Sequence, residues 1–365
     1  MIPSLGPGGA ERVITLLASG LAARGHDVWL VTLARTGEDF FPLDPRVRRL
    51  GLGLMRDSGT VVQALRANVS RLRRLRQVVR SIAPHAVISF MTSMNVLTLL
   101  ACSGLRVRTV VSERIDPDSH DVESFWARLR SFTYRRADAV VVQTEAAAQW
   151  FRKHLKRRLS VTVIPNPIAP ASDLERASMT VPQPFILAAG RLVHQKGFDI
   201  LIRAFAVAAR ERGPLRLAIA GEGPESQALR DLAGELQLED RVLFLGEVRE
   251  LRALMRQADA FVLSSRYEGF PNVLLEALAS DLPVVATDCP GGPREILRGG
   301  EFGLLVPCED TAALADALRR VATDSDLRRR LSANGTLASA PYDVGRVVAR
   351  WEELLSASAS VEKLP

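Results

Sequence analysis

Apolar segments typical of buried strands alternate with amphipathic helical segments along nearly the whole chain. The predicted strands lie at 28–33, 86–90, 108–113 and 139–144 in the first half, and at 184–190, 215–221, 242–246, 260–265, 283–288 and 303–307 in the second. Helical patterns lie between them, at 10–24, 61–82, 93–103, 122–136 and 145–157, and three more close the chain at 310–322, 325–334 and 343–357. Such alternation is typical of parallel sheets built from βαβ units, so we predict an α/β fold.

A proline-rich segment separates the two runs of strands. Pro165, Pro167, Pro170 and, further on, Pro182 cannot lie inside a helix or a central strand. We therefore expect a first domain over 1–165, a linker over 166–183, a second domain over 184–340, and a C-terminal helix and tail over 341–365 that cross back to the first domain. Two such domains that face each other leave a cleft at the carboxyl ends of their strands, where open sheets bind ligands.

Length and composition narrow the class of protein. The chain has 365 residues, of which 47% are hydrophobic and 24% charged, which favours two globular domains and excludes a disordered, collagen-like or coiled-coil chain. The cysteines Cys102, Cys289 and Cys308 lie far apart, so we expect neither a disulfide framework nor a thiolate zinc site, and we expect a cytoplasmic location. Residues 1–7 have neither the basic start nor the apolar run of a signal peptide.

One uncharged segment, 86–105, is long enough to cross a bilayer. Its first five residues have the β-rich pattern of a strand, and the polar residues Thr92, Ser93 and Asn95 interrupt it before the apolar pattern resumes. A buried strand, a polar loop and a helix therefore explain this segment better than a membrane span does.

Charge is distributed unevenly along the chain. Residues 1–165 contain 25 Lys and Arg against 13 Asp and Glu, whereas the remaining residues contain 23 against 28. A basic half joined to a mildly acidic half indicates that only the first half faces a polyanion. The candidates are anionic lipid, a phosphorylated substrate and nucleic acid.

The predicted helix 61–82 concentrates this positive charge. Its apolar residues recur at steps of three and four and form one stripe, namely Val62, Leu65, Val69, Leu72, Leu75, Val79 and Ile82. Arg66, Arg73 and Arg80 share the opposite side. The simpler interpretation is a solvated face on a helix packed against the core; the alternative is a surface for anionic lipid, where each basic residue contributes about 1 kcal/mol. No aromatic side chains alternate with the arginines to stack bases, so we expect no nucleic-acid partner.

Candidate chemistry begins with the segment that follows the strand 260–265. Pro271 stands where a helix would begin, and the free N–H groups of a helix N-terminus attract an anion. Glu268 precedes this point and Glu276 follows it within the helix. Two carboxylates beside an anion site are explained if each accepts hydrogen bonds from neutral hydroxyls, as a nucleotide sugar offers. The alternative leaves both glutamates simply exposed at the surface.

A second candidate is the loop after the strand 184–190. Arg191 and Lys196 lie in this loop and could converge on the same anion. The chain has four lysines among 48 basic residues, which indicates that Lys196 is used as a compact point charge. We expect His194, in the same loop, to be exposed rather than catalytic.

A glycine-rich turn at 6–9 enters the first predicted helix and suits close approach of backbone to phosphate. Its spacing, GxGxxE, is not the dinucleotide fingerprint, and the motifs GxxxxGK[ST] and HExxH do not occur. The triplet Asp116-Pro117-Asp118 could hold a metal ion, although a lone triplet is a weak signal. The triplet 324–326 is predicted to start a helix.

The combination of motifs, in this order, resembles family 4 glycosyltransferases from Pro3 to about Trp351. The matching segments are Gly8–Arg12, Pro165–Pro167, Gly190–Arg191 with Lys196–Gly197, Gly221–Pro224, and the pair Glu268 and Glu276. The resemblance implies the GT-B fold, with two Rossmann-like domains facing across a cleft, and a retaining enzyme that uses no metal and no cofactor. The segments 88–90, 112–114 and 138–140 further resemble members that extend polysaccharide, capsule or lipid-linked oligosaccharide.

The resemblance also implies roles for individual residues, with a UDP-sugar as donor and a glycan or polyprenyl-linked glycan as acceptor. Arg191 and Lys196 would neutralise the diphosphate leaving group, and Glu268 would hold the sugar hydroxyls. The other implied donor-binding residues are Gly190, Gly269, Phe270, Pro271 and Asn272 around the phosphates, Glu276 at the ribose, Gly246 and Val248 near the base, and Gly8 and Gly9 closing the site from the first domain. Glu113 and Arg114 would lie on the acceptor side.

The chain departs from the family pattern in two places. Members usually begin with a short apolar strand before the glycine-rich turn, and residues 1–3 leave almost none of it. Because that strand would be central in its sheet, we expect unpaired backbone on its neighbours, and either an upstream start or a chain that folds poorly. Arg114 stands where many relatives have a histidine near the reacting sugar.

Two other function classes stay open. A nucleotide-sugar epimerase of similar architecture would release free sugar without an acceptor; the two glutamates and the Gly8–Arg12 turn argue against it. A non-catalytic lipid- or polymer-binding module would keep the basic helix, but it would not use Arg191, Lys196 and both glutamates together. If the helix 61–82 binds lipid, the protein is peripheral at the inner face of the membrane.

Overall fold

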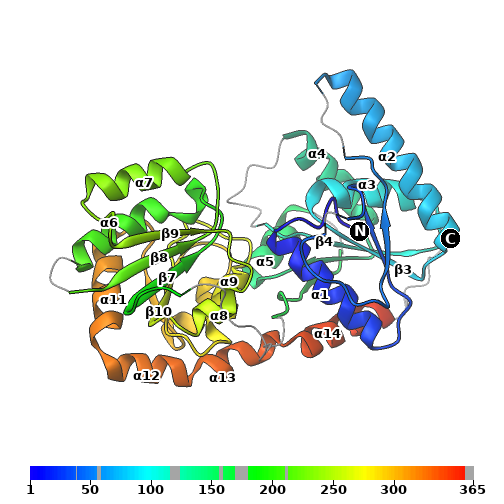
Figure 1. Ribbon diagram of the computed structural model, residues 1–365. Helices are drawn as coiled ribbons and strands as arrows, with labels where there is room; N and C mark the ends of the chain where they lie inside the picture. Colours follow the sequence, from blue (N-terminus) through cyan, green and yellow to red (C-terminus); the bar gives the residue numbers. More distant parts are fainter. Residues whose placement is uncertain are drawn as a thin grey trace. The chain divides into compact units, whose positions relative to one another are not determined.

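The computed structural model describes residues 1–37, 39–55, 59–115, 124–155, 159–168, 180–209 and 213–357 (Figure 1). The chain divides into two compact units, Met1–Ala169 with Asp343–Pro365, and Pro170–Tyr342. The triplet Asp116-Pro117-Asp118 and most of the predicted linker, residues 169–179, lie outside the described residues. Each unit is an α/β fold with parallel strands, which confirms the predicted fold class.

The second unit is built on a parallel sheet in which all six predicted strands of this half are present. Across the described residues its order is β12-β11-β10-β7-β8-β9. The strands are β7 (Phe185–Ala189), β8 (Arg216–Ala220), β9 (Val242–Gly246), β10 (Ala260–Leu263), β11 (Val284–Thr287) and β12 (Leu304–Val306). The order runs outward in one direction from β7 and in the other from β10. The boundary between these two strands is therefore the topological switch point of the sheet, where ligands of open α/β sheets bind.

Helices cover the apolar faces of this sheet (Figure 1). They are η2 (His194–Lys196), α6 (Phe198–Ala209), α7 (Ser226–Glu235), α8 (Leu251–Met255), α9 (Asn272–Leu278), α10 (Pro293–Ile296), η3 (Arg298–Gly300), α11 (Thr311–Thr323), α12 (Ser325–Ala333), α13 (Gly335–Ser339) and η4 (Ala340–Tyr342). Alternate strand residues such as Ile186 and Ile219 form one buried cluster with Phe205 of α6 and Leu318 of α11. The carboxylate of Asp324 accepts from the Leu327 amide at 2.9 Å, which confirms the predicted helix start.

The first unit has four of its strands where the sequence predicted them, and two that the prediction missed. The strands are β1 (Trp29–Thr32), β2 (Arg48–Gly51), β3 (Ala86–Phe90), β4 (Arg108–Ser112), β5 (Ala139–Val142) and β6 (Val161–Val163). They form the parallel pair β1-β2 and the parallel sheet β3-β4-β5-β6. The missed strands are β2, which is polar and partly exposed, and β6, which is three residues long and precedes the proline-rich segment.

Residues 1–3 lie between β1 and β3 and pair with both. The Ile2 amide donates to Val31 at 3.2 Å, and the Ala34 amide donates to Pro3 at 2.9 Å. On the other side the Phe90 amide donates to Met1 at 3.0 Å, and the Met1 amino group donates to the Ile88 carbonyl at 2.6 Å. The expectation of unpaired backbone on the neighbouring strands is therefore wrong, because three residues suffice to make these bonds.

The sheet of the first unit is covered on both faces. The helices are α1 (Gly9–Ala23), α2 (Val61–Ile82), α3 (Thr92–Cys102), α4 (Ser124–Thr133), η1 (Tyr134–Arg136), α5 (Glu145–His154) and α14 (Val344–Ser356). Val110 and Val141 pack with α1 and with Trp351 of α14, whereas Val111 and Val140 pack with α3 and α5. This alternation follows the two-residue period of strands.

The uncharged segment 86–105 forms the strand β3 and the helix α3 rather than a membrane span. Within the described parts of the chain, no helix is both long enough and apolar enough to cross a bilayer.

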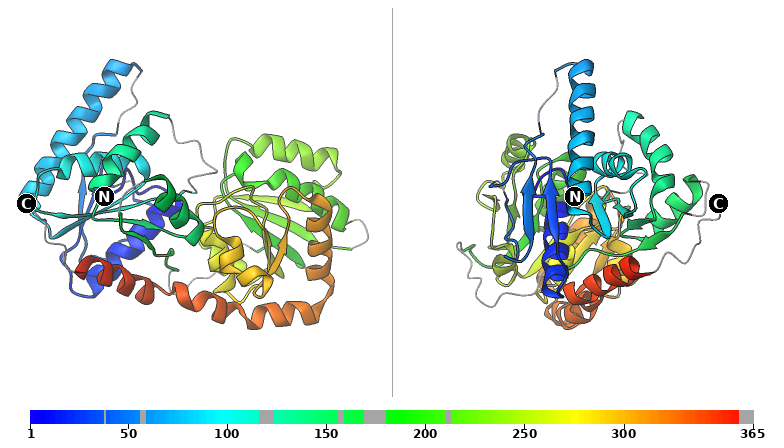
Figure 2. Two further views of the ribbon diagram at one scale, coloured as in Figure 1. Left: turned by 180° about the vertical axis from the view of Figure 1, so that it is seen from behind. Right: turned by 90° about the vertical axis from the view of Figure 1, so that its right-hand side faces the viewer.

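The helix α2 departs from the prediction that its apolar stripe packs on the core. Its second half does, with Leu75 and Val79 buried, but in its first half Val62 is 60% and Leu65 is 65% exposed. Figure 2 shows these first turns extending away from the sheet of their own unit. Periodicity identified the apolar face of this helix correctly, but the rest of the unit covers only half of it.

Candidate active site

The structure brings two predicted site residues, Lys196 and Glu268, into direct contact. Lys196 lies in η2, after β7, and Glu268 lies after β10, so the two loops flank the switch point of the second sheet. The Lys196 Nζ atom lies 2.7 Å from Oε1 and 2.9 Å from Oε2 of Glu268. A compact cation and a carboxylate therefore occupy the position where an open sheet binds its ligand.

The Glu268 carboxylate is almost wholly buried, with 4% of the residue exposed. Its Oε1 atom also accepts from the Ser265 hydroxyl at 2.5 Å. An ionised carboxylate has about four lone-pair directions, and the donors described here use three of them. The sequence analysis assigned Glu268 to sugar hydroxyls; the geometry adds that the same carboxylate holds the Lys196 ammonium.

Two glycines permit the close approach of backbone segments around this pair. Gly197 has φ of +62°, and a Cβ at this position would lie 2.2 Å from the Ser264 carbonyl oxygen. Gly291 has φ of +99°, and its Cβ would lie 1.8 Å from the Glu268 carbonyl oxygen. Any larger side chain would push these segments apart, because both positions combine a left-handed backbone with a blocked Cβ direction. The role of Gly291 was not apparent in the sequence, since its partner lies on another loop.

The other predicted residues of the second unit differ in exposure and in the elements that carry them. Arg191 is exposed, and its side chain has no hydrogen bond or ion pair among the described residues, whereas Glu276 is buried. His194 is exposed, as predicted.

Pro271 caps α9 instead of opening it, and α9 starts at Asn272. Gly190 follows β7, Gly269 and Phe270 follow Glu268, Gly246 ends β9, and Val248 lies two residues beyond it.

Ser265 and Arg266 belong to the site but were not predicted. Ser265 is buried against Glu268, and Arg266 bonds to the loop that carries Lys196. Neither gave a signal in the sequence, because serine and arginine are common and their partners lie far away along the chain.

The remaining predicted residues lie in the first unit. Gly8 caps α1 and Gly9 begins it. Glu113 and Arg114 follow β4, and Glu113 is buried, with hydrogen bonds from the Tyr134 hydroxyl and, at 2.9 Å, from the Thr92 hydroxyl. Burial, followed by the charge of Glu113, raises the pKa of Tyr134 well above its ordinary value, so this hydroxyl remains a donor.

Arg114 is a buried cation with only part of its hydrogen-bonding capacity used. Its Nη1 atom donates to Asn166, and its guanidinium carbon lies 3.7 Å from the centroid of the Phe90 ring. Its Nε and Nη2 atoms are inaccessible to solvent and have no hydrogen-bond partner among the described residues. Burial lowers the pKa of the guanidinium from its ordinary value. The two unused atoms form one edge of the guanidinium, which fits a carboxylate or phosphate.

Within the described residues, no group of three or more His, Cys, Asp or Glu side chains could hold a metal ion. Lys196, whose ammonium is held by Glu268, is a charge that can bind phosphate oxygens.

Two family models match the chain and together span most of it. The model described as "Glycosyl transferase 4-like domain" matches residues 8–167, and the model described as "Glycosyl transferases group 1" matches residues 174–338. Among curated proteins, an α-1,4-N-acetyl-D-galactosaminyltransferase of Campylobacter jejuni, named for a glycan on PP-undecaprenol, is 26% identical over 98% of this chain and 97% of its own length.

Solved structures show the same fold over nearly the whole chain. Sucrose-phosphate synthase from Thermosynechococcus elongatus has a TM-score of 0.81 at 21% identity, covering 96% of this chain and 94% of its own. HepE from Anabaena, crystallised with UDP and glucose, has a TM-score of 0.78 at 21% identity, covering 98% of both chains.

Proposed function

The chain belongs to the glycosyltransferases that combine these two domains, and from this premise we propose that it transfers a sugar from a UDP-sugar to a glycan or polyprenyl-linked glycan, with retention of anomeric configuration. The chain is thus an enzyme, and its GT-B fold is the one that the resemblance implied. The observation that carries the proposal is the pairing of Lys196 with Glu268 at the switch point of the second sheet. The donor is inferred from HepE, whose crystals contain UDP and glucose.

In the proposed reaction, the bond between the anomeric carbon and the diphosphate oxygen breaks, and a bond to the acceptor hydroxyl oxygen forms on the same face of the sugar. Negative charge develops on the leaving diphosphate, where Lys196 and the exposed Arg191 would stabilise it. The acceptor hydroxyl gives its proton to a phosphate oxygen of the donor, so the reaction needs no protein base, metal or cofactor. The products are UDP and the extended glycan.

The other donor contacts follow the same geometry. The lone-pair direction of Glu268 that no described donor uses would accept from a sugar hydroxyl, and the backbone of Gly269–Asn272 would surround the phosphates. Glu276 would bind the ribose, and Gly246 with Val248 would lie near the base. Gly190 would line the phosphate side, and Gly8 and Gly9 would contact the donor from the first domain.

On the acceptor side we propose Glu113 and Arg114. The unused edge of the Arg114 guanidinium supplies two parallel N–H groups, which match a pair of anionic oxygens on a substrate. The Campylobacter jejuni relative is named for an acceptor linked through PP to undecaprenol, and such an acceptor carries these oxygens. Glu113 would hold the strand end that presents Arg114, through its bonds from Tyr134 and Thr92.

We further propose that α2 binds an anionic membrane surface, which would make the enzyme peripheral at the cytoplasmic face. An open depression on this helix is lined by Leu65 and Val69 together with Arg66, Arg73 and Arg74. Exposed apolar side chains beside several cations are the composition of a helix that lies on anionic lipid. Flotation should recover the protein with vesicles that contain phosphatidylglycerol but not with phosphatidylcholine vesicles; equal recovery from both would contradict this part.

The transfer reaction is tested with a panel of nucleotide sugars and a membrane extract as the source of acceptor. We expect one UDP-sugar to yield UDP and a glycan heavier by one sugar residue in mass spectrometry. An epimerase would convert the donor without an acceptor, and a binding module would neither consume it nor be stabilised by UDP in thermal unfolding. Either result would overturn the proposed function.

A further inference from the structure

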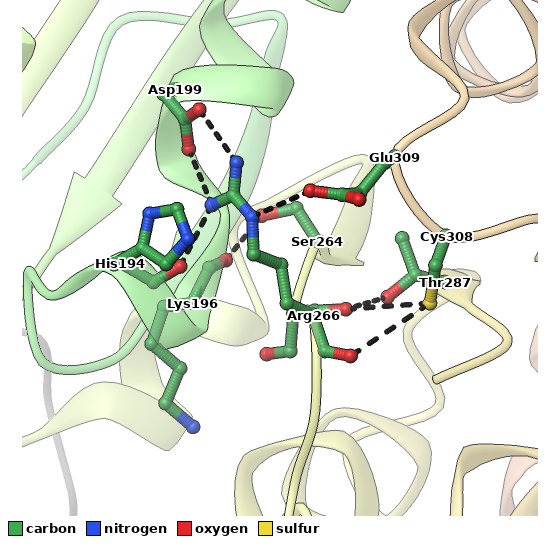
Figure 3. A network of polar contacts seen from close by, with 9 residues as sticks. His194, Lys196, Asp199, Ser264, Arg266, Thr287, Cys308 and Glu309 are labelled. Atoms are coloured by element: carbon green, nitrogen blue, oxygen red, sulfur yellow. Dashed lines mark hydrogen bonds and ion pairs between the residues drawn. The ribbon is translucent and has the colours of Figure 1, made fainter. Parts of the chain in front are cut away.

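Three successive carbonyl groups of the Lys196 loop accept hydrogen bonds from two residues that follow β10, Ser264 and Arg266. The Ser264 hydroxyl donates to the Lys196 carbonyl at 2.8 Å, and the Arg266 amide donates to the Gln195 carbonyl at 2.8 Å. The Arg266 Nη1 atom donates to the His194 carbonyl at 2.7 Å (Figure 3). Each of residues 194–196 is therefore bonded through its carbonyl group to the segment that also carries Glu268.

The side chain of Arg266 extends this fixation to the start of α6. Its Nη1 and Nη2 atoms donate to the two carboxylate oxygens of Asp199 at 2.9 and 2.8 Å, and its Nε atom donates to Glu309 at 2.9 Å (Figure 3). The side chain is 14% exposed. The hydrogen bond from Arg266 lowers the pKa of Asp199, and the same bond raises the pKa of Arg266, so both groups are charged near neutral pH.

We infer that Arg266 is a positioning residue that holds the 194–197 turn so that the Lys196 ammonium faces the donor diphosphate. A lysine side chain is a flexible four-carbon chain, so the position of the Lys196 ammonium depends on its backbone as well as on its bonds to Glu268. The turn itself is a single 3-10 turn, which has few bonds of its own. The charge-assisted bonds of the Arg266 guanidinium to Asp199, together with its bond to the His194 carbonyl, therefore hold this turn in place. This inference rests on the proposed function, because it assigns Arg266 to the same site.

The test is a double-mutant cycle of Arg266→Ala and Lys196→Ala, with UDP and uridine as probes in calorimetry. We expect each single variant to weaken UDP binding about tenfold or more, since charge-assisted bonds to a diphosphate are lost. Uridine, which lacks the phosphates, should bind each variant as it binds the wild-type protein. In the Lys196→Ala background, Arg266→Ala should cause little further loss, because Arg266 acts through Lys196.

Two further variants distinguish a specific loss of UDP binding from a general loss of folding. Arg266→Lys retains a cation but not the fork, so its UDP affinity should lie between those of the wild type and Arg266→Ala. Arg319→Ala removes an arginine paired with Asp316 on the exposed side of α11, and it should leave UDP binding unchanged.

The outcomes separate this inference from the proposed function. A wild-type chain that does not bind UDP, or a Lys196→Ala variant that binds it normally, would contradict the donor site itself. If Lys196→Ala loses UDP affinity while Arg266→Ala retains it, or weakens UDP and uridine equally, the proposed function stands and the positioning role is wrong. Fully additive losses in the double variant would likewise overturn it.

Discussion

The two units each present a substantially buried cation after a strand of a parallel sheet, but they compensate its charge differently. In the second unit Lys196 contacts both oxygens of Glu268, so its charge is balanced within the protein. In the first unit Arg114 donates to an amide and stacks on an aromatic ring, Glu113 acts on it through its charge alone, and the Nε–Nη2 edge of its guanidinium is unused. One site is preorganised and nearly neutral before a ligand binds, whereas the other retains a charge that a ligand would compensate.

This difference predicts that removing Lys196 and removing Arg114 change the stability of the fold in opposite directions. Taking Lys196 away leaves a buried carboxylate without its counter-ion, which destabilises the fold. Taking Arg114 away removes a charge whose burial is only partly compensated, which is neutral or stabilising when an apolar side chain fills the space. Activity should fall in both cases, so stability and activity together distinguish the two kinds of site.

The largest effect is expected for Lys196→Ala. Turnover should fall about 10²–10³-fold, as for other losses of a preorganised group that stabilises developing charge. The free energy of unfolding should fall by about 1–3 kcal/mol, because Glu268 is left buried without the ammonium. Steady-state kinetics and urea denaturation of the purified variant measure both quantities.

Lys153→Ala is the matched control, because Lys153 is an exposed lysine of α5 and should change neither quantity. Near-normal turnover of a folded Lys196→Ala variant would remove Lys196 from the mechanism. Normal stability together with lost turnover would indicate that Glu268 is solvated once Lys196 is absent.

Arg114→Met should have a smaller effect on activity and the opposite effect on stability. Turnover should fall about tenfold, because the charge-assisted contact of the Arg114 guanidinium with the acceptor is lost. The free energy of unfolding should stay unchanged or rise by about 1 kcal/mol, since methionine retains a contact with the Phe90 ring without a buried charge. Kinetics and thermal unfolding test this prediction.

Arg48→Met is its control, because Arg48 also stacks on an aromatic ring, that of Trp29, but is 58% exposed. It should leave turnover unchanged. A marked loss of stability in Arg114→Met would show that Arg114 is compensated within the protein, and the contrast between the units would disappear.

The fold was predictable where strands are buried on both faces, and less so elsewhere. Continuous apolar runs such as 139–142 and 283–286 identified β5 and β11 directly. The strand β2, Arg48–Gly51, begins with two arginines and is partly exposed, so no apolar run in the sequence indicated it. The helix α2 shows a further limit, since its periodicity defines an apolar face but not what covers that face.

The candidate site was predictable as a set of residue types but not as a set of contacts. Lys196 and Glu268 stand in recognisable loops, yet they are 72 residues apart, and only the strand order β10-β7 brings those loops together. Arg266 gave no signal, because the chain uses arginine for most of its cations and the partners of this one lie on two other segments. Sequence spacing thus indicates which groups are present, whereas sheet topology decides which of them meet.

The smallest expected effect is a difference between the two units in how the free energy of unfolding depends on pH. Because Arg266 lowers the pKa of Asp199 below its ordinary value of 3.8, this pair stabilises the fold above that pH and loses its contribution as the pH falls through the lower, folded-state value. The difference in unfolding free energy between wild type and Asp199→Asn should therefore be largest near neutral pH and shrink below pH 3.8. Glu113 acts on Arg114 through its charge and not through a hydrogen bond, so the difference between wild type and Arg114→Met should change less over the same range. Urea denaturation of the three proteins at a series of pH values measures both differences. Equal acid sensitivity of the two differences would show that Arg266 and Arg114 are compensated alike.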